Sequence, residues 1–211
     1  MRLVERDYEM FREIERWRFC LGRHLSEFLF SCNRTCDRRT KTLINANYLE
    51  RRKIIYGVAS IYSLTYKAKM LIGANKRQDK VRVDRIIHDI AVIDTAIYFV
   101  RNFEISLKDI TTEKELHSRN GFSVRNHYPD FIFTKDNKTT CVEVELTLKA
   151  KDKFEKNIRN NFLNYDAQIW VCGTDPRISG FLEDSKMEFS NIEIMKIEEV
   201  KKYVSELNSA R

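Results

Sequence analysis

The sequence is poor in glycine and proline, with six Gly and two Pro in 211 residues. That scarcity excludes collagen-like and low-complexity chains, which are rich in these residues. Long apolar runs are also missing, and none approaches the roughly 20 residues that a membrane-spanning helix requires. The first ten residues, MRLVERDYEM, contain no apolar signal core. We therefore expect a cytoplasmic protein that does not contact a membrane.

Cysteines are few and follow no recognisable framework. The five are Cys20, Cys32, Cys36, Cys141 and Cys172. Their number is odd, and their spacing matches neither a disulfide scaffold nor a common zinc finger. They are expected to be reduced core residues.

Positive charge is concentrated in the first third of the chain. The net charge is +7, and residues 1–70 hold 15 Lys and Arg against 8 Asp and Glu. The remaining residues hold 23 of each sign and are neutral. Such asymmetry favours a module that binds a polyanion joined to a neutral domain, although a solvated basic surface would give the same count.

The first third is expected to form three helices followed by a hairpin. Apolar side chains recur at near-helical spacing in three stretches, and two β-type runs lie on either side of Gly57. The helices are expected over residues 6–20, 23–30 and 34–45, and the strands over residues 53–56 and 60–64. This order is typical of a winged helix-turn-helix.

The third expected helix has an apolar face and a basic face. Cys36, Thr40 and Leu43 share the apolar face. The other side carries cations and hydroxyls, which suit contacts with phosphates and base edges. Three further cations begin the hairpin. The candidate DNA-binding residues are Arg34, Thr35, Arg38, Arg39, Lys41, Thr42, Arg51, Arg52 and Lys53. An ordinary solvated helix face is the alternative.

A polar stretch over residues 76–83 is the expected boundary between two domains, 1–75 and 76–211. A long apolar helix is expected over residues 84–103, and a second helical segment over 109–117. Glu113 in that segment is either an additional metal ligand or a solvated residue at a helix start.

From residue 121 the apolar period changes to two, which indicates β-strands. The expected strands cover residues 122–128, 130–134 and 140–148. On the last, Glu143 and Glu145 share one face and lie about 7 Å apart at the backbone.

A two-residue turn at Asp136-Asn137 would pair Lys135 with Lys138. Counting back then places Asp130 opposite Glu143, with Cβ atoms about 5 Å apart. Carboxylates this close repel unless a cation neutralises them, and oxygen ligands suit Mg²⁺ or Mn²⁺. The register therefore predicts a divalent-metal site.

The rest of the chain alternates between helical and strand patterns. A basic helix is expected over 151–164, strands over 167–172 and 192–197, and a closing helix over 198–207. This order predicts an α/β arrangement with the acids on its central hairpin.

Pro129-Asp130 followed by Glu143-Val144-Glu145 resembles the PD-(D/E)xK nuclease core. The resemblance implies that Asp130 and Glu143 hold a metal that activates water against a phosphodiester. The last motif position is usually lysine, and Glu145 replaces it, as in some restriction enzymes of this fold. The catalytic lysine stays open among Lys149, Lys153 and Lys156. Lys149 would lie about 13 Å from Glu145 if the strand continued.

The order of motifs over most of the chain resembles the replication-relaxation proteins, which include MobC-type relaxases. The matching runs are Tyr48-Leu49, residues 61–65, residues 88–94 and residues 113–116. The resemblance implies an α+β chain with a winged helix and a mixed-sheet, restriction-endonuclease-like domain. It also implies metal-dependent nicking of double-stranded DNA at a plasmid or mobile-element transfer origin. A coupling protein or other mobilisation proteins would then be partners.

Two alternative functions remain beside this hypothesis, and the role of one residue is open. The second domain could be a relic, which would leave a DNA-binding accessory or regulatory protein. The chain could also be a restriction or repair nuclease that makes double-strand breaks. His127, three residues before Asp130, is either an accessory site residue or an ordinary structural histidine.

Overall fold

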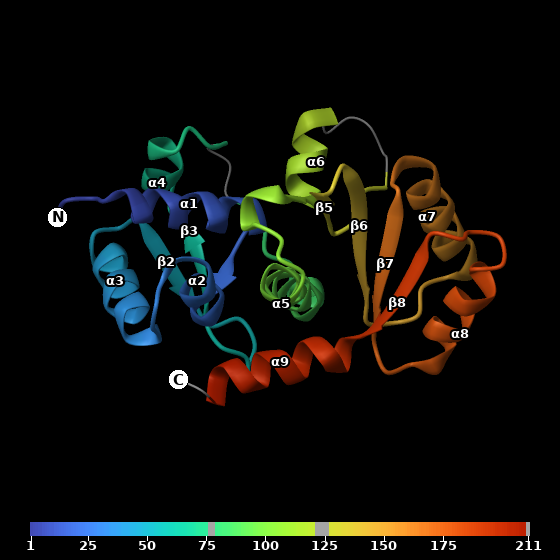
Figure 1. Ribbon diagram of the computed structural model, residues 1–211. Helices are drawn as coiled ribbons and strands as arrows, with labels where there is room; N and C mark the ends of the chain where they lie inside the picture. The colour runs from blue at the N-terminus through green and yellow to red at the C-terminus, as the bar shows by residue number, and fades with distance from the viewer. Residues whose placement is uncertain (76–78, 121–126, 210–211) are drawn as a thin grey trace. The chain divides into compact units, whose positions relative to one another are not determined.

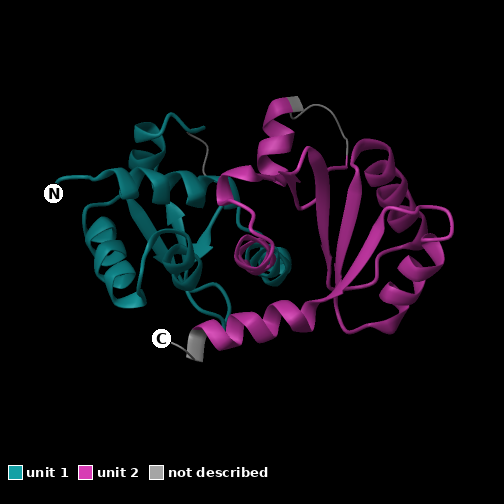
Figure 2. Ribbon diagram, in the orientation of Figure 1, with its two compact units in different colours: residues 1–93, 211 teal, residues 94–210 magenta. Residues whose placement is uncertain are grey.

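The computed structural model describes residues 1–75, 79–120 and 127–209 (Figure 1). The chain divides into two compact units, Met1–Ile93 and Asp94–Ala210 (Figure 2). The division falls inside helix α5 (Ile86–Asn102), downstream of the polar stretch 76–83. Among the helices of the described ranges, none is both long and apolar enough to cross a membrane.

The first unit contains the three predicted helices and a small antiparallel sheet. Its elements are α1 (Glu5–Trp17), β1 (Cys20–Leu21), α2 (Gly22–Leu29), α3 (Asn33–Asn45), β2 (Leu49–Arg52), β3 (Ile61–Leu64) and α4 (Tyr66–Leu71). The strand order is β1-β3-β2. The helix ends lie within three residues of the expected positions, and the tight turn after α3 has Asn47 at a φ of 59°.

The expected position of the first hairpin strand was wrong. The strand is β2 at Leu49–Arg52, and residues 53–60 form the connection to β3. The apolar residues that suggested a strand lie in this loop. Two of them, Ile54 and Ile55, pack against a buried cluster that includes Ile61. Burial of apolar side chains from a loop gives the same sequence signal as burial from a strand.

The second unit has a mixed α+β fold around a five-stranded sheet. Its elements after α5 are β4 (Ile110–Thr112), α6 (Glu113–Asn120), β5 (Phe131–Lys135), β6 (Lys138–Glu145), α7 (Lys151–Asn164), β7 (Ala167–Cys172), α8 (Pro176–Ser185), β8 (Ile192–Lys196) and α9 (Ile197–Ser209). The strand order is β4-β5-β6-β7-β8. The β4–β5 and β5–β6 pairs are antiparallel, and the β6–β7 and β7–β8 pairs are parallel.

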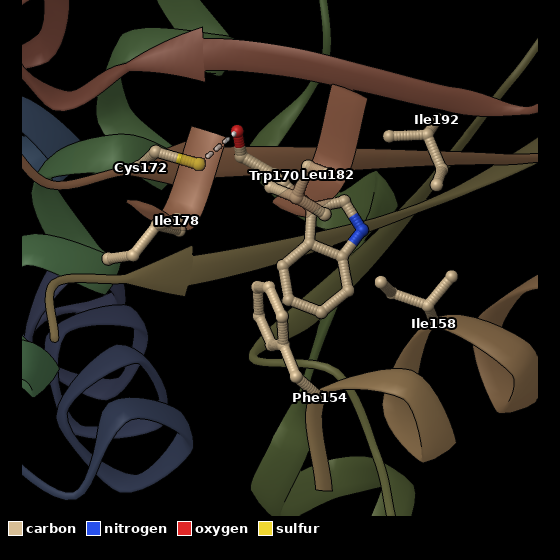
Figure 3. Close-up of a cluster of buried hydrophobic side chains, with 7 residues drawn as sticks. All are labelled: Phe154, Ile158, Trp170, Cys172, Ile178, Leu182 and Ile192. Atoms are coloured by element: carbon tan, nitrogen blue, oxygen red, sulfur yellow. Dashed lines mark hydrogen bonds between the residues drawn. The ribbon is translucent and has the colours of Figure 1, made fainter. Parts of the chain in front are cut away.

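Alternation along the central strands divides their side chains between two buried faces. Phe131 and Phe133 of β5 contact Phe99 of α5 on one face, at ring-centroid distances of 6.1 and 5.6 Å. Trp170 of β7 lies on the other face, where it meets Phe154 of α7 (Figure 3). Because Glu143 of β6 is paired with Trp170, it belongs to the α7 side of the sheet.

The edge strand of this sheet was not expected. The strand predicted over residues 122–128 falls mostly outside the described residues, because 121–126 are not described, and 127 and 128 are not in a strand. The edge strand is β4, followed directly by α6, so the segment 109–117 is a strand joined to a helix. A strand of three residues is too short for a clear alternation, which explains why the sequence pattern predicts a helix there.

Four of the cysteines are buried. We therefore expect the protein to lose stability at alkaline pH. Burial raises the pKa of Cys20, Cys36, Cys141 and Cys172, to about 12 for Cys36 and Cys172. An unfolded thiol titrates near pH 8.5. The folded state therefore holds these protons more tightly, and its stability is complete below about pH 8.5 and falls as pH rises toward 12.

Each such thiol should contribute a fall of about 1.4 kcal/mol per pH unit in this window. Urea unfolding under reducing conditions at several pH values measures it. In Cys172→Ala, the free energy of unfolding should fall less steeply with pH than in wild type. In Cys32→Ala it should not, because Cys32 is exposed. Equal slopes in the two variants would contradict this explanation.

Candidate functional site

The β5–β6 hairpin has the predicted register. Asp136 and Asn137 have φ angles of 50° and 60°, the left-handed values of a two-residue hairpin turn. Lys135 pairs with Lys138, and Phe131 pairs with Val142. Continuing this register by one residue sets Asp130, just before β5, opposite Glu143. The carboxylate of Asp130 accepts a 2.8 Å hydrogen bond from the backbone N–H of Val144, which lies between the two glutamates.

Glu143 is buried and held by two side chains. Its residue exposure is 4%, and its Oε1 lies 2.6 Å from Nε2 of His127. The same oxygen accepts a 3.1 Å hydrogen bond from Nδ2 of Asn161, which α7 supplies and which is fully buried. His127 therefore lies beside the acids, as its interpretation as an accessory site residue requires.

Glu145 is paired with Lys149. The strand ends at Glu145, and the chain turns before α7 begins at Lys151, so the ammonium group returns to the carboxylate. The expected separation of about 13 Å was wrong because it assumed that the strand continued to residue 149. Glu145 is 2% exposed.

The pKa shifts show that these charges form one electrostatic cluster. Burial raises the pKa of Glu145, Lys149 opposes that shift, and the charges of Glu143 and Asp130 add to it. Burial lowers the pKa of Lys149, but the hydrogen bond and charge of Glu145, with Glu143 and Asp130, raise it overall. The site thus holds three acids within mutual electrostatic reach of one lysine.

Both glutamates have partners among the protein's own side chains. Lys149 pairs with Glu145, and His127 contacts Glu143. Across the described ranges, no three His, Cys, Asp or Glu side chains converge in a geometry that would hold a metal ion. Repulsion between the carboxylates is therefore not enough by itself to indicate a bound metal ion, because protein side chains already contact Glu143 and Glu145.

The other candidate residues of this unit lie in different surroundings. The backbone N–H of Glu113 donates to the carbonyl oxygen of Asp130 at 3.0 Å, and its side chain lies 3.7 Å from His117. Lys153 and Lys156 are exposed on α7. Of the three candidate lysines, all within the described residues, Lys149 alone pairs with an acid of the cluster.

Sequence reasoning missed the contribution of α7 to this site. Asn157 and Asn161 are both buried, at 3% and 0% exposure, and lie four residues apart on one helix face. Two amides on an otherwise apolar stripe of a helix are a signal for a polar site beneath it, because buried amides require partners. Asn161 Oδ1 is buried and has no hydrogen-bond partner. Tyr165 follows α7, and burial raises its pKa to about 12, with Cys141 and Glu143 adding to the shift.

The basic face of α3 is exposed as expected, with one exception. Arg34, Thr35, Arg38, Lys41 and Thr42 are exposed, while Cys36, Thr40 and Leu43 are buried. Arg39 instead donates from Nε to Asp7 of α1 at 2.7 Å, and Asp7 is fully buried. Arg39 therefore neutralises a buried charge, which a helical-face count could not reveal.

The three cations of the hairpin also make contacts within the first unit. Arg51 lies over the ring of Tyr62, with 6.0 Å from its Cζ to the ring centroid. Arg52 donates to Ser63 at 3.3 Å. The ammonium group of Lys53 donates to the carbonyl oxygen of Val58 across the β2–β3 loop. Arg51 and Lys53 remain exposed.

Comparisons with protein-family models, with curated proteins and with solved structures found no match to this chain. No family is assigned on that basis. The chemistry of the acid cluster and the basic helix therefore carries the functional assignment.

Proposed function

We propose that this protein is a metal-dependent DNA-nicking enzyme of the relaxase type, acting at a transfer origin of a plasmid or mobile element. One observation carries the proposal: the register of the β5–β6 hairpin and the Lys149–Glu145 ion pair bring together Asp130, Lys149 and two buried glutamates, Glu143 and Glu145. Carboxylates beside a lysine are the groups that metal-dependent phosphodiester cleavage uses.

The order of elements around the cluster supports a PD-(D/E)xK nuclease core. Helix α5 precedes the antiparallel strands β4, β5 and β6, which helix α7 and the parallel strand β7 follow, and α6 is inserted between β4 and β5. The motif lacks a lysine at residue 145, and Lys149 supplies an ammonium group to Glu145. A lysine from the loop after the strand would thus replace the usual lysine within the strand.

The donor chemistry suits Mg²⁺ or Mn²⁺. Asp130, Glu143 and Glu145 offer hard oxygen ligands. The buried Oδ1 of Asn161 has no hydrogen-bond partner and would suit a cation beside Glu143. His127 would have to leave Glu143 for an ion to bind there. A bound metal would supply an activated water molecule. Lys149 would stabilise negative charge that develops on the phosphate.

The first unit would hold the DNA as a winged helix. Three helices and a three-stranded sheet of order β1-β3-β2 support this proposal, and α3 would then be the recognition helix. The exposed cations of α3, with the excess positive charge of residues 1–70, support binding to phosphates.

Replacing Arg34 and Arg38 with alanine should weaken DNA binding by about tenfold or more. The slope of log affinity against log salt concentration should fall by about one for each phosphate contact removed. Fluorescence anisotropy with a labelled duplex at several salt concentrations measures both. Arg39→Ala is the matched control, because it leaves Asp7 as an unpaired buried charge and should cost about 3 kcal/mol of stability. If Arg34 and Arg38 can be replaced without changing affinity, α3 does not bind DNA.

Product topology on a supercoiled plasmid tests the proposed reaction. With Mg²⁺ or Mn²⁺ and a plasmid carrying DNA adjacent to the native gene, open circles should accumulate. Linear product from the start would instead indicate a restriction or repair nuclease. Covalent linkage of protein to the nicked strand can be read on the same sample after denaturation.

A DNA-binding accessory protein with a relic nuclease fold is the second candidate. The partners of the acids favour it, because Lys149 pairs with Glu145 and His127 contacts Glu143 without any metal. DNA binding that depends on Arg34 and Arg38, together with no cleavage in either metal, would support this candidate over the enzyme.

A further inference from the structure

The loop between β2 and β3 presents one aromatic side chain to solvent. Tyr56 is 100% exposed, whereas Ile54, Ile55 and Val58 of the same loop are partly buried. Burying an aromatic side chain is favourable, so a ring that is fully exposed on a folded loop is available for an external contact. Gly57, which follows it, has a φ of 80° that turns the chain at this point.

The loop is fixed to the first unit on both sides of Tyr56. Ile54, Ile55 and Val58 pack against a buried cluster that includes Phe19, Leu21 and Ile61. The ammonium group of Lys53 donates to the carbonyl oxygen of Val58, which closes the loop. Because the flanking residues are anchored, a contact made by Tyr56 would not require the whole loop to become ordered.

Positive charge precedes Tyr56 along the chain. Arg51 and Lys53 are exposed, and Arg51 lies over Tyr62. Figure 1 shows α3 and β2 running in opposite directions, so the first turn of α3 and the β2–β3 loop lie toward the same end of this unit. A polyanion bound by Arg34 and Arg38 would thus extend toward an aromatic ring that exposed cations precede in the chain.

We propose that Tyr56 stacks on an unpaired base of bound DNA, so that the first unit prefers duplex DNA with an adjacent unpaired segment. Only a base without a neighbour on one side offers its face to a ring, and such stacking combines with cations that follow the backbone. The inference rests on the proposed DNA binding and adds the substrate form: a duplex next to a melted or single-stranded region.

The experiment compares two labelled DNAs, a fully paired duplex and the same duplex with a short bubble. Wild type should bind the bubble DNA about tenfold more tightly, as expected for one stacked base. Tyr56→Ala should lose that preference without a change in salt dependence, and Tyr56→Phe should retain it. Tyr66→Ala is the matched control, because Tyr66 is also exposed but begins α4.

A second readout uses the fluorescence of Tyr56→Trp. Trp17 and Trp170 are 6% and 0% exposed, so an indole at position 56 would report on the solvent-exposed loop. Its emission should be quenched by bubble DNA and less affected by the paired duplex. This fluorescence signal reports stacking at position 56 directly in the full-length, folded variant, so it does not depend on whether the protein cleaves DNA.

The outcomes separate this inference from the proposed function. If Tyr56→Ala binds both DNAs as wild type does while the Arg34 and Arg38 variant is weakened, the stacking inference is wrong and DNA binding by α3 stands. If wild type binds neither DNA, the proposed function fails together with the inference.

Discussion

Glu143→Gln is expected to reduce metal-dependent nicking by about a hundredfold or more. Glu143 is the acid at which the hairpin register, His127 and Asn161 meet. Glutamine keeps the size and one oxygen but removes the charge that would hold a divalent cation. The initial rate of open-circle formation from supercoiled plasmid measures the effect. Because the Glu143 side chain is buried, thermal unfolding is the control that shows that the variant still folds.

Glu155→Gln is the matched control for that variant. Glu155 lies on α7 with an exposed side chain and pairs with Lys151 at 3.7 Å. The control should nick at the wild-type rate. A Glu143→Gln protein that is folded and as active as wild type would show that the cluster is not the active site.

Lys149→Met is expected to reduce cleavage by about a hundredfold while leaving metal binding intact or tighter. The loss follows because the ammonium group would stabilise charge that develops on the phosphate. Metal binding should not weaken, because Lys149 occupies the carboxylate of Glu145 that the ion would use. Single-turnover cleavage and calorimetric titration with Mn²⁺ separate these two effects.

Lys153→Met provides the comparison for Lys149→Met. Lys153 lies four residues further on and is exposed on α7, so its replacement should leave cleavage unchanged. The assignment of the lysine would be overturned if Lys153→Met were inactive and Lys149→Met fully active. If both variants were fully active, neither Lys149 nor Lys153 would take part in cleavage, and Lys156 would remain as the candidate.

The sequence predicted the hairpin that carries the site because local chemistry determines it. The alternation over β6 and the two-residue turn at Asp136-Asn137 set the register without help from the rest of the fold. Helix α7 and strand β7 were predicted at their observed ends, since each has a long periodic pattern. The opposition of Asp130 and Glu143 follows from these local rules.

The contacts made by the site depend on where the chain turns, and periodicity does not contain that information. Lys149 was placed far from Glu145 because nothing in the sequence marks the end of β6 at residue 145. Asn161 reaches Glu143 only because α7 crosses over the sheet. Arg39 was grouped with exposed cations because its partner, Asp7, is 32 residues away. Tertiary contacts decide all three cases.

Calorimetric titration of Mn²⁺ into the full chain is the most direct measurement of whether the acid cluster holds a metal. We predict saturable binding to wild type, weakened at least tenfold in Glu143→Gln and unchanged in Glu155→Gln. Wild-type protein that is folded and binds DNA but shows no saturable uptake of Mn²⁺ or Mg²⁺, with DNA present or absent, would contradict the proposed metal site.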